Sequence, residues 1–443
     1  MNRREFVTGS AAAVAGLSLS NQIRAETSPN EKITIAAVGV RGRGFTVLEA
    51  FAACSDVDIK YICDIDQNVL EKRTREISEK IRRPPQKIRD FRKALDDPSV
   101  DAIVLGTPTH WHAIPMIMAC QAGKDVYVEK PDSHNCIEGQ MMVAASQKYK
   151  RVVQLGTQAR SGPYFQELID YIREGHLGQT LFAKAWESAQ QRSLGHPPDS
   201  DPPPSVDYDT WLGPAPKRPF NPTRFHGNWR WFFDYGAGDL GNDGVHRLDF
   251  TRWAFETALE AHGDPPLGQL QAISAHGGKC YFDDIQEWPD NLLVTYDYGA
   301  GRIMSYEMRL WTRYPLEGEK EGGIVYGDQG YIVIGNEYWR AYAKDGEVVK
   351  KGGAARGYFG NTLPHVENFL QCMRTRNKPQ ADLETVGHPS SLMCHLGNAA
   401  WRAGRTIRMD PQTYTCIGDD DANQYLSRAT YRRPWTLPSL AQI

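Results

Sequence analysis

The chain has no excess of basic residues and no long apolar run, and each absence excludes a class of protein. Its 443 residues carry a formal net charge of -3, which creates no positive field for a phosphate backbone, so we expect no nucleic-acid partner. No run of about 20 apolar residues is present to cross a bilayer, so we expect no stable membrane span. These absences favour a small-molecule partner.

The chain also lacks a regular cysteine pattern. Its eight cysteines form no Cys-x-x-Cys pair, which predicts buried thiols and not a disulfide framework. His110-x-His112 is insufficient for a zinc site, and no His/Cys cluster has zinc-ligand spacing. We therefore predict no metal site.

Residues 1–30 are predicted to carry a targeting signal and not part of the fold. The segment Arg3-Arg4-Glu5-Phe6 precedes a mildly apolar stretch over residues 7–19, a pattern that resembles a twin-arginine export signal. We expect export by that route to the periplasm or cell envelope. A disordered leader is the alternative, and the cleavage position near Ala25 stays open because Ile23 is a poor match to the recognition site.

Residues 31–156 alternate short apolar runs with helical patterns, which predicts an α/β Rossmann domain with a doubly wound parallel sheet. We expect strands at 33–40, 57–63, 102–105, 126–128 and 152–155. Helices are expected from residue 45 and over 68–82, 112–122 and 138–149. The chain length predicts two domains, and we place their boundary at Gly156.

Residues 157–443 are predicted to form an α+β domain with a large, mostly antiparallel open sheet. Expected helices cover 164–173 and 245–255, and the Pro-rich stretch over 196–222 is predicted to be irregular. Turn signals separate candidate strands at 270–275, 292–298, 302–308, 324–326, 331–334 and 339–343.

The first predicted strand ends in the glycine-rich turn Gly39-Val40-Arg41-Gly42-Arg43-Gly44. Gly39 and Gly44 match the first and third glycines of G-x-G-x-x-G, but Arg41 stands at the second, where glycine lets the backbone approach a pyrophosphate. We expect a displaced phosphate, held by helix-terminal amides, the Gly42 amide and the Arg41 charge.

Asp64 follows about 20 residues after this turn, where a carboxylate can bind the hydroxyls of an adenosine ribose. A carboxylate there would repel a 2′-phosphate. We therefore predict NAD as the cofactor, with NADP as the alternative because Arg41 and Arg43 are close by.

Two later motifs extend this pattern. The segments over residues 106–112 (GTPTHWH) and 128–131 (VEKP) resemble the two signatures of the Gfo/Idh/MocA superfamily, named for glucose-fructose oxidoreductase and inositol dehydrogenase. The resemblance continues through residues 156–158 and 241–249, so it covers nearly the whole chain after residue 30. Residues 211–216 and 228–231 are similar to exported members of the superfamily.

The resemblance implies a site at the carboxyl ends of the parallel strands. Lys130 would lie beside the nicotinamide and the substrate hydroxyl, and Pro131 would follow a cis bond. His246 is the candidate general acid/base, and Asp249 would orient its imidazole or bind a sugar hydroxyl. The residues expected to surround the cofactor are Thr107, Pro108, His112, Glu129, Lys130 and Gln158.

One position departs from the family pattern. Many members carry an aspartate where this chain has Asn242, which leaves the proton-handling role of that carboxylate open. Sugar sites pair polar side chains with aromatic faces, and the candidates near the matched motifs are Arg160, Tyr164, Arg230, Trp231 and Asn242. Ordinary helix packing is expected for His365, His388 and His395.

The resemblance implies an NAD(P)-dependent oxidoreductase acting on a sugar, glycoside or polyol hydroxyl, assembled as a homodimer or homotetramer through its open sheet. An exported enzyme meets no soluble NADH pool, so we expect the cofactor to stay bound through many turnovers. One alternative is an NAD-dependent glycosidase or lyase that oxidises a ring hydroxyl transiently and then eliminates. The other is a non-catalytic sugar-binding protein that kept the fold.

Overall fold

The computed structural model describes residues 32–353, 362–410 and 413–443. The predicted export signal in residues 1–30 lies outside the described residues. In the described part of the chain, no helix combines the length and apolar character needed to cross a bilayer. All eight cysteines are free thiols, and all but Cys280 are buried.

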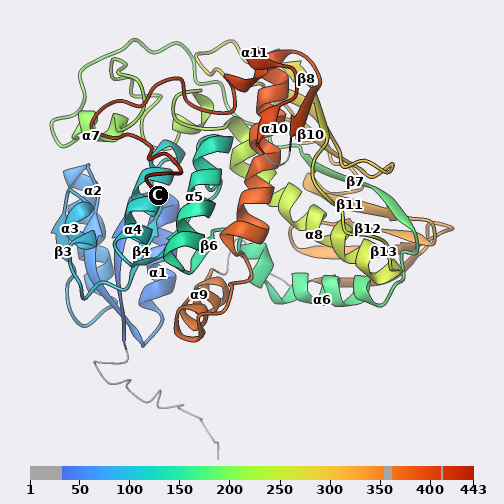
Figure 1. The fold of residues 1–443 in the computed structure, drawn as a ribbon, viewed down its shortest axis with the longest axis horizontal. Helices are drawn as coiled ribbons and strands as arrows, with labels where there is room; N and C mark the ends of the chain where they lie inside the picture. The colour runs from blue at the N-terminus through green and yellow to red at the C-terminus, as the bar shows by residue number, and fades with distance from the viewer. Residues whose placement is uncertain (1–31, 354–361, 411–412) are drawn as a thin grey trace, which may run out of the picture.

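The N-terminal half forms a six-stranded parallel sheet with the strand order β3-β2-β1-β4-β5-β6, which confirms the predicted doubly wound fold (Figure 1). The order reverses between β1 and β4, and ligands bind such sheets at that point. The strands are β1 (Ile33–Val38), β2 (Val57–Cys63), β3 (Gln86–Ile88), β4 (Ala102–Leu105), β5 (Asp125–Val128) and β6 (Val153–Leu155). The helices are α1 (Gly42–Ala52), α2 (Gln67–Ser78), α3 (Arg92–Leu95), α4 (Ala113–Gln121) and α5 (Cys136–Tyr149).

The C-terminal half forms a ten-stranded sheet with the order β14-β13-β12-β11-β7-β10-β9-β8-β15-β16. Its pairs are antiparallel except for β7 with β10, as predicted for a mostly antiparallel sheet. The strands are β7 (Thr180–Glu187), β8 (Ala272–Gly278), β9 (Asn291–Asp297), β10 (Ile303–Arg309), β11 (Glu321–Gly327), β12 (Gly330–Ile334), β13 (Tyr338–Ala343), β14 (Val348–Gly353), β15 (Ile407–Asp410) and β16 (Thr415–Cys416). The helices are α6 (Pro163–Arg173), α7 (Tyr208–Leu212), α8 (Val245–His262), α9 (Leu363–Thr375), α10 (His388–Ala403) and α11 (Asp420–Asn423).

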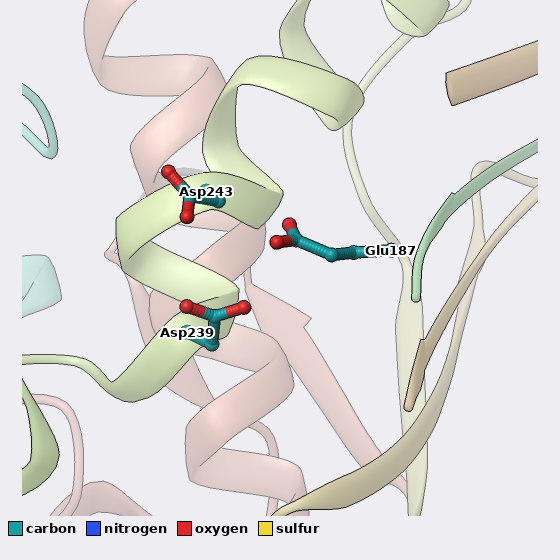
Figure 2. A group of neighbouring side chains, drawn as sticks. All are labelled: Glu187, Asp239 and Asp243. Atoms are coloured by element: carbon teal, nitrogen blue, oxygen red, sulfur yellow. The ribbon is translucent and has the colours of Figure 1, made fainter. Parts of the chain in front are cut away.

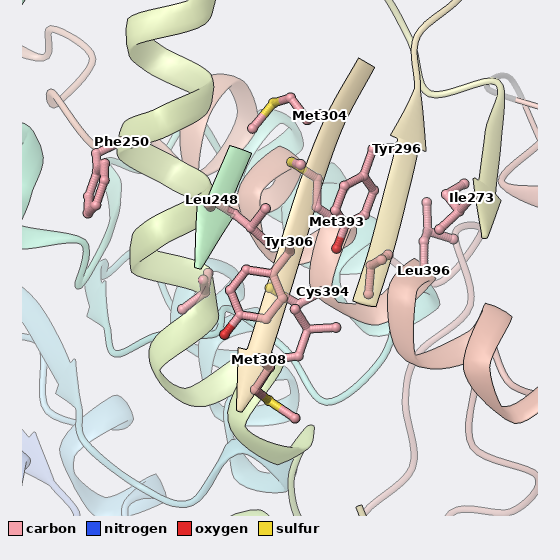
Figure 3. Close-up of a cluster of buried hydrophobic side chains, with 14 of the residues drawn as sticks. Leu248, Phe250, Ile273, Tyr296, Met304, Tyr306, Met308, Met393, Cys394 and Leu396 are labelled. Atoms are coloured by element: carbon pink, nitrogen blue, oxygen red, sulfur yellow. The ribbon is translucent and has the colours of Figure 1, made fainter. Parts of the chain in front are cut away.

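Helices α8 and α10 pack on one face of this sheet and bury its core. Figure 3 shows Leu248 of α8 beside Tyr306 of β10, with Met393 and Leu396 of α10 against Tyr296 of β9. These five side chains are at most 1% exposed. The packing fixes α8, whose first turn carries His246.

The two halves share a core, because α9 returns to the Rossmann sheet. Phe369 of α9 contacts Phe51 and Tyr127 edge-on, with ring centroids 6.2 and 6.0 Å apart. All three rings are fully buried. The stability of the nucleotide-binding sheet therefore depends on a helix more than 200 residues away in sequence from its last strand.

This packing predicts a large loss of stability for Phe369→Ala. Removing a buried phenyl ring leaves a cavity, and we expect the free energy of unfolding to fall by about 3–5 kcal/mol. The exposed Gln371→Ala on the same helix is the control, with an expected change of about 0.5 kcal/mol or less. Chemical denaturation followed by tryptophan fluorescence measures both, and equal losses would show that α9 is not part of this core.

Candidate functional site

A cavity of about 290 Å³ lies at the carboxyl ends of the parallel strands. It runs from Asp64, at the end of β2, past the turn after β1, to Glu129 and Lys130 after β5. Residues of the second half close its other side, among them Trp229, Arg230 and Asn242. Its lining follows the ends of β1, β2, β4 and β5, where a doubly wound sheet binds a dinucleotide.

The turn after β1 presents its backbone to this cavity. Gly39 has φ +77°, and a Cβ there would lie 2.7 Å from the Thr107 amide nitrogen. Gly42 has φ +44°, and no atom lies within 4 Å of the place its Cβ would take. Because Gly42 begins α1, a phosphate group can approach the first amides of that helix.

Gly44 has a different role from the one predicted. It does not line the cavity, and a Cβ on it would stand 1.9 Å from the Gly39 carbonyl oxygen. Gly44 therefore allows α1 to pack closely on the turn.

Asp64 and Arg41 both line the cavity, as predicted. The Asp64 carboxylate accepts hydrogen bonds from the Val40 and Asp66 amides, each 3.1 Å long, so it also holds the glycine-rich turn against β2. Burial raises the pKa of Asp64 to about 6, although these backbone donors lower it in part. The carboxylate keeps lone pairs for ribose hydroxyls.

Thr107, Pro108, Glu129 and Lys130 also line the cavity, as expected. The Glu129 carboxylate accepts hydrogen bonds from Arg43 Nε at 3.1 Å and from Gln158 Nε2 at 3.2 Å. Gln158 does not reach the cavity. Its predicted contact with the cofactor is replaced by a supporting contact to Glu129.

Lys130 lies at the junction of the two halves. The Lys130–Pro131 peptide bond is cis, as the resemblance implied. Lys130 Nζ donates to the Asn242 carbonyl oxygen at 2.5 Å and to Asn242 Oδ1 at 3.1 Å, and Asp243 Oδ1 lies 3.9 Å away. These contacts fix the ammonium group at the end of the cavity formed by Glu129 and Asn242.

His246 lies in the first turn of α8 and is 2% exposed. Burial is the main cause that lowers its pKa well below the usual value, and the positive charge of Lys130 lowers it further. The imidazole is therefore neutral at physiological pH and can accept a proton. His246 neighbours Lys130 but does not itself line the cavity.

Asp249 and Arg160 pair with each other in the structure. Arg160 Nη2 and Nε lie 2.9 and 3.0 Å from the two oxygens of the Asp249 carboxylate, and Ser390 Oγ donates to the same carboxylate at 2.7 Å. The pair is buried, and neither residue lines the cavity. Their hydrogen bonds are thus made largely within the fold, between the two side chains and to Ser390.

Three further residues assigned to a ligand also lie outside the cavity lining. The Tyr164 hydroxyl donates to the Gly335 carbonyl, and Trp231 is 3% exposed in the core. The ring nitrogens of His112 lie 2.8 Å from the Pro131 carbonyl oxygen and 2.9 Å from the Thr107 carbonyl oxygen, and a neutral imidazole donates to one of the two.

The other histidines match the expected packing. His365 bonds Ser161 Oγ at 2.7 Å, and His388 Nδ1 bonds Asp132 Oδ2 at 2.9 Å. His110 bonds the Trp211 carbonyl oxygen at 2.9 Å, so His110 and His112 both face backbone groups.

The aromatic wall of the cavity was not predicted from the sequence. It is lined by Trp211, Phe225, His226 and Trp229, which all lie between β7 and α8, with Trp211 in the short helix α7. The density of aromatic residues between 211 and 231 is the signal that could have indicated a ligand. A Pro-rich irregular segment alone is typical of a surface loop.

A second missed feature is a group of carboxyl groups beside Lys130. Glu187, Asp239 and Asp243 place one oxygen each within 4.8 Å of the others (Figure 2). Glu187 and Asp239 are 1% exposed, and neither Glu187 Oε2 nor Asp239 Oδ2 has a hydrogen-bond partner. Such a group can hold protons or a hard cation.

Burial, followed by the charge of Asp243, raises the pKa of Asp239 to about 7. Burial also raises the pKa of Glu187 well above its usual value. Asp239 therefore binds a proton over a pH range in which an unfolded aspartate has lost it.

This shift predicts a pH-dependent gain of stability for Asp239→Asn. Because the folded pKa is raised, the wild-type protein loses stability as the pH rises from about 4 to about 7. The amide avoids this loss and keeps an oxygen for the 3.3 Å hydrogen bond from Asn242 Nδ2. We expect the variant to melt on the order of 2 °C above wild type at pH 8 and less above it at pH 5.

The exposed Asp96→Asn is the control for losing one carboxylate. The difference in melting temperature between this variant and wild type should be the same at both pH values. Thermal melts at the two pH values measure this. If Asp239→Asn raises the melting temperature equally at pH 5 and pH 8, the raised pKa of Asp239 is contradicted.

Comparisons with known proteins agree with this geometry. The family described as the oxidoreductase family with an NAD-binding Rossmann fold, Gfo/Idh/MocA, matches residues 33–157. Its C-terminal α/β domain matches residues 185–311 and 355–437. Curated relatives include Glycosyl hydrolase family 109 proteins of Shewanella species, 24% identical over 209 residues. That match covers 42% of this chain and 45% of those relatives, so it spans less than half of their length.

Solved structures share the fold at low identity. Levoglucosan dehydrogenase in complex with NADH and levoglucosan gives a TM-score of 0.64 at 17% identity, over 85% of this chain and 99% of that one. Aldose-aldose oxidoreductase from Caulobacter crescentus gives a TM-score of 0.61 at 18% identity, over 85% of this chain and 100% of that one. The WlbA dehydrogenase from Bordetella pertussis, in complex with NADH and UDP-GlcNAcA, gives a TM-score of 0.61 at 18% identity, over 86% of this chain and 99% of that one.

The family matches cover both halves of the chain, and the cavity lies at the switch point of the matched Rossmann fold. The chain therefore belongs to the Gfo/Idh/MocA oxidoreductase family and carries its NAD-binding Rossmann fold.

Proposed function

We propose that the protein transfers hydride between NAD held in the cavity and a hydroxyl-bearing carbon of a sugar, glycoside or polyol. The observation that carries this proposal is the fixed ammonium group of Lys130, held by Asn242 at one end of the cavity. NAD, when bound, supplies the hydride acceptor. The Asp64 carboxylate at the opposite end of the cavity favours NAD over NADP.

Lys130 and His246 divide the proton chemistry. The Lys130 ammonium can donate a hydrogen bond to the substrate oxygen and stabilise the negative charge that develops there. The neutral His246 beside it can take up the proton that leaves the hydroxyl. The substrate thus loses a hydride from carbon and a proton from oxygen, and the reverse steps reduce a carbonyl.

The sugar specificity is supported by the other side of the cavity. Trp229 offers an aromatic ring, and Arg230 and Asn242 offer polar groups within the same cavity. Sugars bind between such aromatic faces and hydrogen-bonding groups. The solved relatives with levoglucosan and with UDP-GlcNAcA support this class of substrate.

A redox-neutral glycosidase is the second candidate, and the Glycosyl hydrolase family 109 relatives favour it. In this reaction, the same site would oxidise a ring hydroxyl, the acidified neighbouring C–H would lose a proton, and the glycosidic group would leave. Water would then add to the resulting unsaturated ketone in place of the glycosidic group, and the reduced cofactor would return its hydride to the carbonyl carbon. Both reactions suit an exported enzyme that keeps its cofactor.

We also propose that the protein assembles as a homodimer or homotetramer and is exported. Phe182, Leu293 and Tyr326 of the large sheet stay 37–44% exposed, which supports pairing of this sheet between subunits in a homodimer or homotetramer. The twin-arginine pattern in residues 1–30 supports export to the periplasm or cell envelope.

The test is reduction of bound NAD by a panel of sugars and glycosides. We expect one class to raise the reduced-nicotinamide absorbance of the purified protein, and Lys130→Met to slow that reduction by about 10²–10⁴-fold. The exposed Lys148→Met on α5 is the matched control and should react at the wild-type rate. Release of the leaving group from a glycoside would identify the glycosidase reaction.

Reduction of bound NAD at an unchanged rate in Lys130→Met would contradict the role of Lys130. A protein that binds no dinucleotide would contradict the proposed function as a whole.

A further inference from the structure

Residues 205–230, here called the cover segment, extend from the second half onto the end of the parallel sheet. Val206 forms an antiparallel bridge with Asp66, the Gln67 amide donates to the Ser205 carbonyl at 2.9 Å, and the Asp207 amide donates to the Ile65 carbonyl at 3.1 Å. The cover segment is therefore hydrogen-bonded to the residues that directly follow Asp64. This is the end of the cavity that we expect to hold the adenosine.

A second attachment lies on the other side of the same cavity. Trp111 Nε1 donates to the Thr210 and Trp211 carbonyl oxygens, both at 3.0 Å. Gly213 then passes so close that a Cβ would stand 2.3 Å from the Trp111 ring. This contact fixes the cover segment to the residues that follow β4.

A third attachment is the contact between His226 and Asp66. His226 Nε2 lies 3.2 Å from Asp66 Oδ2, and His226 has φ +55°, a conformation that most residues other than glycine rarely adopt. A Cβ on the next residue, Gly227, would lie 4.0 Å from Arg41 Nη1. The far end of the cover segment is thus held over Arg41, which replaces the second glycine of the phosphate turn.

The C-terminal segment, residues 428–443, holds the cover segment from outside. It runs past α7 and ends beside α4 and α5 (Figure 1). Arg432 Nε donates to the Gly213 carbonyl at 3.0 Å and Nη1 pairs with Asp209 at 2.6 Å. Trp435 packs on Trp111, with ring centroids 4.7 Å apart.

The cover segment also forms part of the cavity wall. Trp211, Phe225, His226 and Gly227 line the same cavity as Asp64 and Arg41. Aromatic faces opposite a ribose-binding carboxylate suit an adenine ring, which stacks on such surfaces. The cavity therefore has a wall on the Rossmann side and a wall on the cover side at this end.

We propose that the cover segment forms the outer half of an adenosine-binding subsite and retains the dinucleotide through successive turnovers. The inference rests on the proposed function and adds the residues responsible for retention. A dinucleotide enclosed in this way leaves only when the cover segment separates from Ile65–Gln67 and Trp111. That separation breaks backbone hydrogen bonds and the contacts of Arg432 together, so release is slow.

The experiment measures the release of NADH from the full-length protein. Protein loaded with NADH is diluted into excess NAD, and the loss of bound NADH fluorescence gives the release rate. Arg432→Ala loosens the C-terminal segment, and His226→Asn removes the imidazole contact with Asp66 while keeping a residue that tolerates positive φ. We expect each variant to release NADH about tenfold faster than wild type.

Two controls remove similar groups elsewhere. Arg405→Ala breaks a bidentate ion pair with Asp419 on the surface, and His196→Asn breaks an exposed pair with Asp283. Both should release NADH at the wild-type rate. Arg432→Ala should also keep the wild-type rate of a single hydride transfer, because Arg432 does not line the cavity.

Two results would overturn the inference. One is a wild-type protein that releases its cofactor faster than it turns over, and the other is release by both variants at the rate of their controls. Either result leaves the proposed function standing if sugars still reduce bound NAD and Lys130→Met slows that reduction as expected. Failure to bind NADH at all would contradict both.

Discussion

The hydrogen bonds between Lys130 and Asn242 join the two halves of the molecule at the point where the site lies. Lys130 follows β5 of the parallel sheet, and Asn242 lies in the turn that leads into α8. The position of the ammonium group therefore depends on the large sheet that buries α8 as well as on the Rossmann sheet. The site therefore needs the cores of both halves. Helix α9 and the C-terminal segment, which pack on the first half, add to the contacts between them.

Asn242 is also consistent with the carboxyl groups around it. Glu187 and Asp239 are buried, and like-charge repulsion from Asp243 helps to raise the pKa of both. An aspartate at position 242, as many family members have, would add a fourth carboxyl group to this cluster. The neutral amide avoids that repulsion and still offers an oxygen to Lys130. The asparagine at position 242 therefore suits a site that already holds three carboxyl groups.

Sequence patterns predicted the features that depend on local periodicity and on backbone geometry. The buried strands of the parallel sheet, the glycine-rich turn and the positions of Asp64 and Lys130 are of this kind. Strand β3 was missed because it is three residues long and two of them are exposed. Arg160 and Asp249 were assigned to the ligand because a sequence cannot show that two charged residues 89 positions apart neutralise each other.

The cover segment escaped prediction for a similar reason. Its proline-rich, irregular sequence has no periodicity, and its place over the cavity depends on contacts with Ile65–Gln67, Trp111 and Arg432, which are distant in sequence. The function proposed for this site requires one cavity to hold the whole dinucleotide, and a crystal structure with bound NAD would show whether it does. We expect the nicotinamide beside Lys130 and the adenosine beneath Phe225 and His226. An adenosine lying in solvent, or a nicotinamide remote from Lys130, would refute the proposal.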